Sequence, residues 1–413
     1  MTSYDYSPEI EINSEDKSIL EGLDRRKRIR DLQFFSGKCK FKATQFCGSI
    51  ALSRETIEII PTIKDGASFY KSLYFMLNRI YSADIRPPRL EMTTEAYLTE
   101  LNKLADVIAL LLCQRIALLE REGLFNEYVE HQRTEHYLIG KLLLNDQLAD
   151  SSLQPRFHCQ YDELTVNNLH NQMLAFSLRQ LLSISLNLEI QKKVTRALSL
   201  FSEIEPSWLD ESAFENLFYS RLNQHYEPMH NLCKLVLRNL SVESIRGNRK
   251  ATSFLIDVNK VFEAFLASIL RDALAHEGYS VYYQFPSYLL KPINHKHQLP
   301  LKADIVIRSL RSNKMAMVID AKFKEVFVTD AYARRALRNS DFFQIYGYAS
   351  KLKCYGLLVY PGKSELIEDR IDLEWRAEDS EAPSFGLVLV DLTQSAETMG
   401  SNLISFVRAK LNQ

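Results

Sequence analysis

Two aspartates and a lysine stand out among the apolar residues between Lys302 and Lys324. Asp304 lies in the run ADIVIR, and Asp320 and Lys322 lie in the run VIDAKFK. An apolar segment normally excludes such groups unless they are paired or bind an ion. Carboxylate oxygens are ligands of hard divalent cations, and a lysine can stabilise charge on an attacked phosphate. These residue types therefore point to metal-dependent cleavage of a phosphodiester bond.

Two short strands are expected to position these groups. The first covers residues 303–307 and the second covers residues 315–322, and the polar stretch 309–314 suits a hairpin connection. Because strand side chains alternate between faces, Asp320 and Lys322 share one face of the second strand. Charged residues at exposed strand ends produce the same pattern, so spacing alone leaves both interpretations open.

The metal hypothesis gives each group a role. Asp304 and Asp320 ligate one or two Mg²⁺ ions, with the main-chain carbonyl of Ala321 as a further oxygen ligand. The metal lowers the pKa of a bound water, and the hydroxide attacks the phosphodiester in line. Lys322 orients that water or stabilises the charge that develops on the phosphate. Lys324 either contacts phosphate or is simply exposed.

Two expected helices bring further candidates to the hairpin. Residues 257–277 have helical apolar spacing, and Glu263 lies beside the apolar face, as a metal ligand or as an exposed helix carboxylate. Residues 334–351 form the second helix, in which Gln344 and Tyr348 share a face because they are four residues apart. This pair either lines the cleft or belongs to the edge of the core.

The order of the expected elements indicates an α+β or α/β chain. Its last part, residues 246–413, is predicted to be a mixed sheet flanked by helices. Before it we expect a flexible arm, a small β-rich region and a helical middle region, over residues 1–35, 36–90 and 91–245. The arm contains a basic cluster, residues 25–30, which is either a solvated face or a contact with DNA or a partner.

Composition argues against several classes of protein. The net charge of −1 provides no basic field for nucleic acid, so DNA binding without a partner is disfavoured. The six cysteines contain no CxxC pair, which disfavours a disulfide framework and a zinc site. The acidic N-terminal residues do not resemble a signal peptide, and the longest apolar run is too short to span a bilayer. We therefore expect a cytoplasmic protein.

Several segments resemble the McrC family, the endonuclease subunits of McrBC modification-dependent restriction systems. ADIVIR, VIDAKFK, FFQIYGYA and YGLLVYP are similar to the family's PD-(D/E)XK nuclease domain, which has a restriction-endonuclease-like fold. Upstream, FEAFLASIL is similar to the helix before that core. RFHCQYDELTVNNLHNQML and IEIIPTIKDGASFYKSLYFML are similar to the middle and N-terminal segments. The resemblance covers nearly the whole chain beyond residues 1–35.

The resemblance implies a partner, a substrate and site residues. McrC-type subunits work with McrB, a hexameric AAA+ GTPase that reads methylated cytosine and translocates DNA. They bind the GTPase through the N-terminal half, here including residues 36–90, stimulate GTP hydrolysis and cut double-stranded DNA with the C-terminal domain. The nuclease motif falls on Asp304, Asp320 and Lys322, and the QxxxY motif of related nucleases falls on residues 344–348.

Two other functions stay open. The chain has no Gly-x4-Gly-Lys-Ser/Thr loop, so it is not itself the GTPase. A non-catalytic adaptor that only activates the GTPase would not need the intact set of Asp304, Asp320 and Lys322. A stand-alone nuclease would cut DNA with Mg²⁺ but without partner or nucleotide.

Overall fold

The computed structural model describes most of the chain. The described residues are 7–61, 66–81, 101, 103–150, 156–184, 186–206, 208–243, 251–290, 299–329, 335–337, 339–362, 372–375, 383–394 and 398–412. The chain forms two compact units, one from Met1–Leu104 with Glu243–Gln413 and the other from Ala105–Val242. The first unit is therefore discontinuous in sequence, since the second is inserted between its two parts.

The first unit is folded from its earliest described residues, so the flexible arm predicted over residues 1–35 is wrong there. Helix α1 (Ser14–Arg25) begins after Asn13, whose side chain accepts hydrogen bonds from two backbone N–H groups of the first turn. Its apolar residues pack into a core with the sheet β1-β3-β2, formed by Ile10–Glu11, Lys38–Ala43 and Ile29–Phe35. Helix α1 buries only three apolar residues, Ile19, Leu20 and Leu23, so its apolar face is short.

A second small sheet joins the two sequence segments of the first unit. Within this unit its order is β5-β4-β10, with bounds Thr56–Ile59, Phe46–Ala51 and Ala251–Asp257. At Gly48 the backbone has a φ of +126°, and an added Cβ would lie 2.2 Å from the Phe254 carbonyl oxygen. Only glycine tolerates this close approach. Strand β10 leads directly into α9 (Val258–Leu274), so this sheet anchors the helix that carries Glu263.

A six-stranded mixed sheet forms the rest of the first unit. Its order is β11-β12-β13-β16-β18-β17, with bounds Tyr279–Leu290, Leu299–Ser309, Met315–Ala321, Tyr355–Pro361, Phe385–Val390 and Asp372–Trp375. The pairs β11–β12, β12–β13 and β17–β18 are antiparallel, whereas β13–β16 and β16–β18 are parallel. The predicted hairpin is confirmed as β12–β13.

Helices pack against this sheet and position the candidate site. Helix α10 (Asn339–Leu352) packs on an apolar cluster that includes Val306, Val318 and Leu358. Helix α9 contacts β11, β12 and β13, and it also contacts α2 (Gly66–Ile80) and α11 (Ser401–Leu411). The helix predicted from residue 334 begins later, because 335–337 form a strand (β15, Arg335–Leu337) paired with β14 (Phe327–Thr329).

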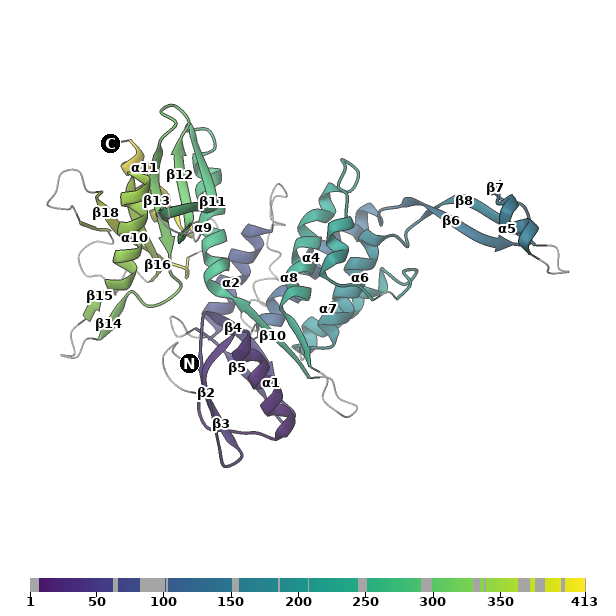
Figure 1. Ribbon diagram of the computed structural model, residues 1–413, viewed down its shortest axis with the longest axis horizontal. Coiled ribbons are helices and arrows are strands. Elements are labelled where there is room, and N and C mark those ends of the chain that lie inside the picture. Colours follow the sequence, from purple (N-terminus) through teal and green to yellow (C-terminus); the bar gives the residue numbers. More distant parts are fainter. Residues whose placement is uncertain are drawn as a thin grey trace. The chain divides into compact units, whose positions relative to one another are not determined.

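The second unit combines helices with a long hairpin. Its helices are α4 (Leu104–Glu122), α6 (Leu169–Leu182), α7 (Leu188–Ser199) and α8 (Glu227–Asn239), with short 3-10 turns at Glu211–Asn216 and Gln224–Tyr226. The hairpin pairs β6 (Glu127–Glu135) with β8 (Phe157–Thr165). Figure 1 shows β7 (Lys141–Leu142) and α5 (Leu144–Ala149) at its far end. Within the described ranges, no helix is both long and apolar enough to cross a membrane.

Candidate functional site

The β12–β13 hairpin brings Asp304 and Asp320 together where the two strands separate. The backbone N–H of Ala321 donates to Asp304 Oδ2 at 2.9 Å, which fastens the first carboxylate to the second strand. Asp320 is fully buried, and Lys322 Nζ lies 3.1 Å from its Oδ1 and 2.9 Å from its Oδ2. Although Oδ2 is ion-paired with Lys322, this buried oxygen accepts no hydrogen bond from the described residues.

Burial and mutual repulsion disfavour the charged forms of these carboxyls. Burial raises the pKa of Asp304, and the nearby Glu263 carboxylate raises it further. Burial also raises the pKa of Asp320, an effect that Lys322 partly offsets. Although burial opposes it, the attraction of Asp320 and Asp304 raises the pKa of Lys322, which therefore stays protonated. A cation held here would relieve the repulsion between the carboxylates.

Glu263 lies close enough to Asp304 and Asp320 for their charges to interact, and it is not an exposed helix carboxylate. We call Asp304, Asp320 and Glu263 the carboxylate cluster. It is partly buried on α9, and the side-chain amide of Gln284 donates to its Oε2 at 3.3 Å. Burial raises the pKa of Glu263, and Asp257 and Asp320 act in the same direction. The sequence had left this residue between two roles, and the structure places it beside the aspartates.

Gln344 and Tyr348 approach the cluster from α10. Gln344 Nε2 donates to the Tyr348 hydroxyl at 2.8 Å, as expected for residues on one helix face, and that hydroxyl donates to the Lys302 carbonyl at 3.4 Å. Burial raises the pKa of Tyr348, and the charges of Asp320 and Asp304 contribute. Tyr348 also packs against the apolar cluster beneath α10, so the pair lies at the edge of the core, where the charges of the carboxylates reach the Tyr348 hydroxyl.

A second ion pair, between Lys324 and Asp341, lies next to the cluster. The sequence patterns did not predict it. Lys324 Nζ lies 2.8 Å from Oδ2 and 2.9 Å from Oδ1 of Asp341, which is nearly buried, and the Tyr360 hydroxyl donates to the same carboxylate at 2.7 Å. Lys324 is thus paired and not simply exposed. Asp341 precedes Gln344 and Tyr348 by three and seven residues, so the helical period of α10 could have placed it on their face.

Helices α9 and α2 hold the chain just after Lys322. The backbone N–H of Phe323 donates to Asn259 Oδ1 at 3.2 Å, and Asn259 lies one helical turn before Glu263 on α9. The Phe323 ring packs edge-on against Phe262, at 5.5 Å between centroids, and Phe69 of α2, at 6.3 Å. These contacts fix the end of β13 against the helix that carries Glu263.

The carboxylate oxygens of Asp304, Asp320 and Glu263 are ligands of the type that hard cations prefer, although their present arrangement does not form a metal centre. Among the residues described, no three His, Cys, Asp or Glu side chains are grouped closely enough to hold a metal ion. Lys322 forms an ion pair with Asp320, and the Ala321 N–H donates a hydrogen bond to Asp304. The unsatisfied Oδ2 of Asp320 and the neighbouring Glu263 nevertheless supply oxygen donors of the type that Mg²⁺ prefers.

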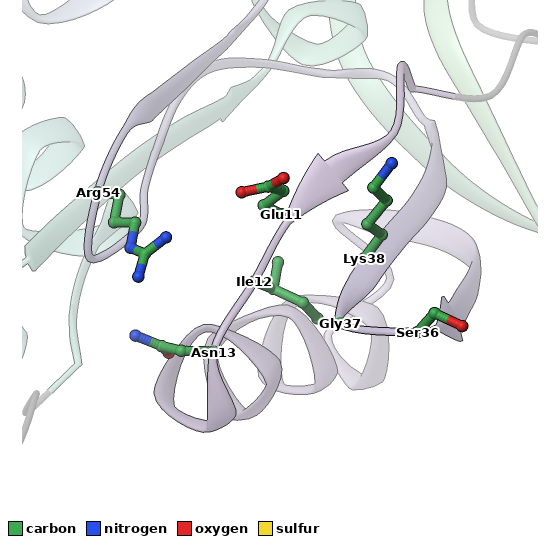
Figure 2. Close-up of a pocket in the computed structure, with 7 residues that line it drawn as sticks. All are labelled: Glu11, Ile12, Asn13, Ser36, Gly37, Lys38 and Arg54. Atoms are coloured by element: carbon green, nitrogen blue, oxygen red, sulfur yellow. The ribbon is translucent and has the colours of Figure 1, made fainter.

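A pocket elsewhere in the first unit shares no residue with this cluster. Figure 2 shows it beside the start of α1, with a volume of about 150 Å³ and a lining of Glu11, Ile12, Asn13, Ser36, Gly37, Lys38 and Arg54. The Asn13 side chain already caps α1, and Lys38 pairs with Glu9 at 3.1 Å. Two polar side chains of this pocket thus have structural partners, and we assign the pocket no part in the chemistry.

Comparisons with known proteins identify the family. The sequence profile described as McrBC 5-methylcytosine restriction system component matches residues 41–361. A search of curated proteins finds no match. A chain in the refined half-complex from the tetradecameric assembly of Thermococcus gammatolerans McrB AAA+ hexamers with bound McrC is similar. It has 23% identity and a TM-score of 0.63, over 96% of this chain and 89% of that chain.

A chain in the cryo-EM structure of the Thermococcus gammatolerans McrBC complex has 21% identity and a TM-score of 0.47, over 66% of this chain and 87% of that chain. At these identities, the similarity to the half-complex chain shows a common fold. The family profile spans well over half of the sequence. The chain therefore belongs to the family of McrBC 5-methylcytosine restriction system components.

Proposed function

We propose that this chain is the DNA-cutting component of an McrBC-type system. It is a Mg²⁺-dependent endonuclease with a PD-(D/E)XK site, and it cleaves double-stranded DNA carrying modified cytosine together with a hexameric AAA+ GTPase. The observation that carries the proposal is the cluster of Asp304, Asp320 and Lys322 at the end of β12–β13. Burying carboxylates that repel one another lowers the stability of the fold, and binding of a catalytic cation would explain why they are buried together.

Each residue of the cluster has a part in this chemistry. Asp304, Asp320, Glu263 and the carbonyl of Ala321 would hold Mg²⁺, which when bound supplies Lewis-acid activation of water and phosphate. Lys322 stays protonated beside Asp320 and contributes positive charge where the phosphate gains negative charge.

Helix α10 completes the proposed site. Gln344 orients the Tyr348 hydroxyl, whose remaining contact with the Lys302 carbonyl is long at 3.4 Å. A phosphate oxygen can replace that carbonyl as the acceptor. Gln344 and Tyr348 would therefore position the DNA backbone against the carboxylates.

The second unit supports the partner in this proposal. Large apolar side chains are exposed along and beyond the β6–β8 hairpin, namely Tyr128, Tyr137, Leu138, Leu144, Leu148 and Leu164. Exposed apolar groups in such number are typical of protein-binding surfaces. The Thermococcus gammatolerans assembly contains McrB AAA+ hexamers with bound McrC. We therefore propose a hexameric AAA+ GTPase as the partner of this chain. We extend the expected partner-binding region from residues 36–90 to this hairpin.

Substitution of Asp320 tests the proposal with the partner present. We expect Asp320→Ala to reduce DNA cleavage to background and to leave stimulated GTP hydrolysis intact, because the site and the hairpin are separate parts of the chain. Asp272→Ala removes an exposed carboxylate of α9 and is the control.

Three outcomes would contradict the proposal. Unchanged cleavage by Asp320→Ala would remove the assignment of the site. Stimulated GTP hydrolysis without cleavage by the unchanged chain would favour the adaptor. Mg²⁺-dependent cutting by the purified chain alone would favour a stand-alone nuclease.

A further inference from the structure

Strand β11 is irregular at the residue that faces Asp304. Gln284 has a φ of +51°, a left-handed conformation that is unfavourable for residues with a side chain. Pairing with β12 continues on both sides, at Tyr283 and Phe285, so Gln284 lies across from Asp304. Strained residues of this kind persist only where the surrounding structure holds them, and they concentrate at functional sites.

The left-handed residue places two consecutive polar side chains together. In a regular strand, neighbouring side chains point to opposite faces. Here Tyr282 and Phe285 both pack against the apolar cluster beneath α10, with ring centroids 5.7 Å apart. Between them, Gln284 Nε2 lies 3.3 Å from the Tyr283 hydroxyl oxygen and 3.3 Å from Glu263 Oε2. The irregularity thus brings both polar groups to α9, beside the carboxylates.

Among the residues that the structure describes, the Tyr283 hydroxyl is a donor without an acceptor. Its oxygen accepts from Gln284, and no acceptor for its own proton lies among the described side chains and backbone. The residue is 37% exposed, so part of its side chain can be reached by a ligand. Burial, followed by the charges of Glu263 and Asp304, raises the pKa of Tyr283, which keeps the proton in place. An O–H donor at the edge of this cluster suits a phosphate oxygen, which accepts hydrogen bonds.

We propose that β11 supplies two further residues of the nuclease site. Gln284 is a positioning residue that holds the Glu263 carboxylate for the cation. Tyr283 is a substrate-binding residue whose hydroxyl donates to a non-bridging oxygen of the DNA phosphate. The inference rests on the proposed nuclease function and assigns roles to residues that the D…DxK and QxxxY patterns leave out.

Tyr283→Phe tests the phosphate contact, because it removes only the hydroxyl. We expect the full chain with its partner to bind DNA about five- to tenfold more weakly, measured with Ca²⁺ in place of Mg²⁺ so that the DNA stays intact. Cleavage under subsaturating DNA should fall by a similar factor. Tyr282→Phe is the matched control, since the neighbouring ring packs in the apolar cluster, and it should stay within about twofold of the unchanged chain.

Gln284→Gly tests the positioning role, because glycine accepts the left-handed backbone and lacks only the side chain. We expect Mn²⁺ affinity, measured by calorimetry on the full chain, to fall several-fold. In a Glu263→Gln background the same substitution should change Mn²⁺ affinity no further, since the carboxylate it positions is absent.

Two results would overturn the inference. One is Tyr283→Phe binding DNA as tightly as Tyr282→Phe does. The other is Gln284→Gly lowering Mn²⁺ affinity equally in both backgrounds, or not at all. DNA cleavage by the unchanged chain with its partner and GTP is measured in parallel, as a separate test of the proposed function. If the unchanged chain does not cut, the proposed function fails and the inference fails with it.

Discussion

The two lysines beside the carboxylate cluster have different partners and different consequences. Lys322 is held by Asp320, whose pKa burial raises. Lys324 is held by Asp341; although burial opposes it, hydrogen bonds from Lys324 and Tyr360 keep the pKa of that carboxyl below its usual range. The first pair keeps a positive charge where phosphate chemistry is proposed. In the second pair both carboxylate oxygens have partners, and the hydrogen bond from Tyr360 fixes α10 against β16.

Asp341→Asn should therefore lower stability without touching the proposed metal ligands. The amide can still accept from Tyr360, but Lys324 loses its ion partner at a site that is only partly open to water. We expect a loss of about 2 kcal/mol in the free energy of unfolding, discounted from fully buried pairs for that exposure. Denaturant titration measures it.

A matched control separates burial from charge. Asp272→Asn breaks the pair with Arg79, in which both side chains are exposed, and should cost less than about 0.5 kcal/mol. Equal losses for the two substitutions would mean that the Lys324–Asp341 pair does not support the structure.

At this scale the sequence predicted some residues and missed others for physical reasons. Asp304, Asp320 and Lys322 follow from strand alternation within one hairpin, which is a local pattern. The role of Gln284 depends on a left-handed backbone that β11 adopts against the usual alternation. The partner of Lys324 is Asp341 on α10, which is 17 residues away in the sequence and belongs to no local strand pattern.

Among the elements, α6 and α8 of the second unit are joined through buried histidines. His230 Nε2 donates to the His170 carbonyl at 3.0 Å, so its Nδ1 must accept from the Tyr219 hydroxyl at 2.9 Å. Asn223 Nδ2 lies 3.2 Å from His170 Nε2. Burial lowers the pKa of His230 to about 3, so α8 packs around a neutral ring.

This packing predicts a loss of stability in mild acid. The unfolded chain takes up a proton at His230 near its ordinary pKa of about 6.5, whereas the folded chain does so only near a pKa of about 3. The contribution is complete above the unfolded pKa and is lost as pH falls between these values. The slope is at most about 1.4 kcal/mol per pH unit.

Stability measured from neutral pH to pH about 5 in His230→Gln and in the unchanged chain isolates this contribution. The variant should lose less stability on acidification, because glutamine does not titrate. His136→Gln, an exposed position, should behave as the unchanged chain does. An identical pH slope in His230→Gln and the unchanged chain would contradict the neutral, buried histidine.

Elements with long apolar faces were predicted from the sequence, and short elements were missed. The long apolar faces of α4 and α9 and the alternating hairpin were visible in the sequence. Helix α1 (Ser14–Arg25) was missed, because it buries only three apolar residues. Strand β15 was absorbed into the predicted helix, because its three residues show no period of their own.

Across the whole molecule, the discontinuous first unit is what the sequence could not predict. Strand β10 pairs with β4 from about two hundred residues earlier, with Phe254 opposite Ser49. The Ser72 hydroxyl of α2 donates to the Leu392 carbonyl at 2.7 Å. Such long-range pairs leave no local pattern. They make the N-terminal segment part of the structure that supports the carboxylate cluster, while the inserted second unit carries the exposed hairpin.

Cation binding by the carboxylate cluster is the most direct test of the proposed chemistry. Calorimetric titration of the purified chain with Mn²⁺ at neutral pH needs neither DNA nor partner. The unchanged chain and the Asp272→Asn control should bind the cation, and Asp320→Asn should lose that binding, because it replaces the buried carboxylate with a neutral amide. Equal binding by Asp320→Asn, or no binding by the unchanged chain, would contradict a metal-dependent nuclease site at Asp304 and Asp320.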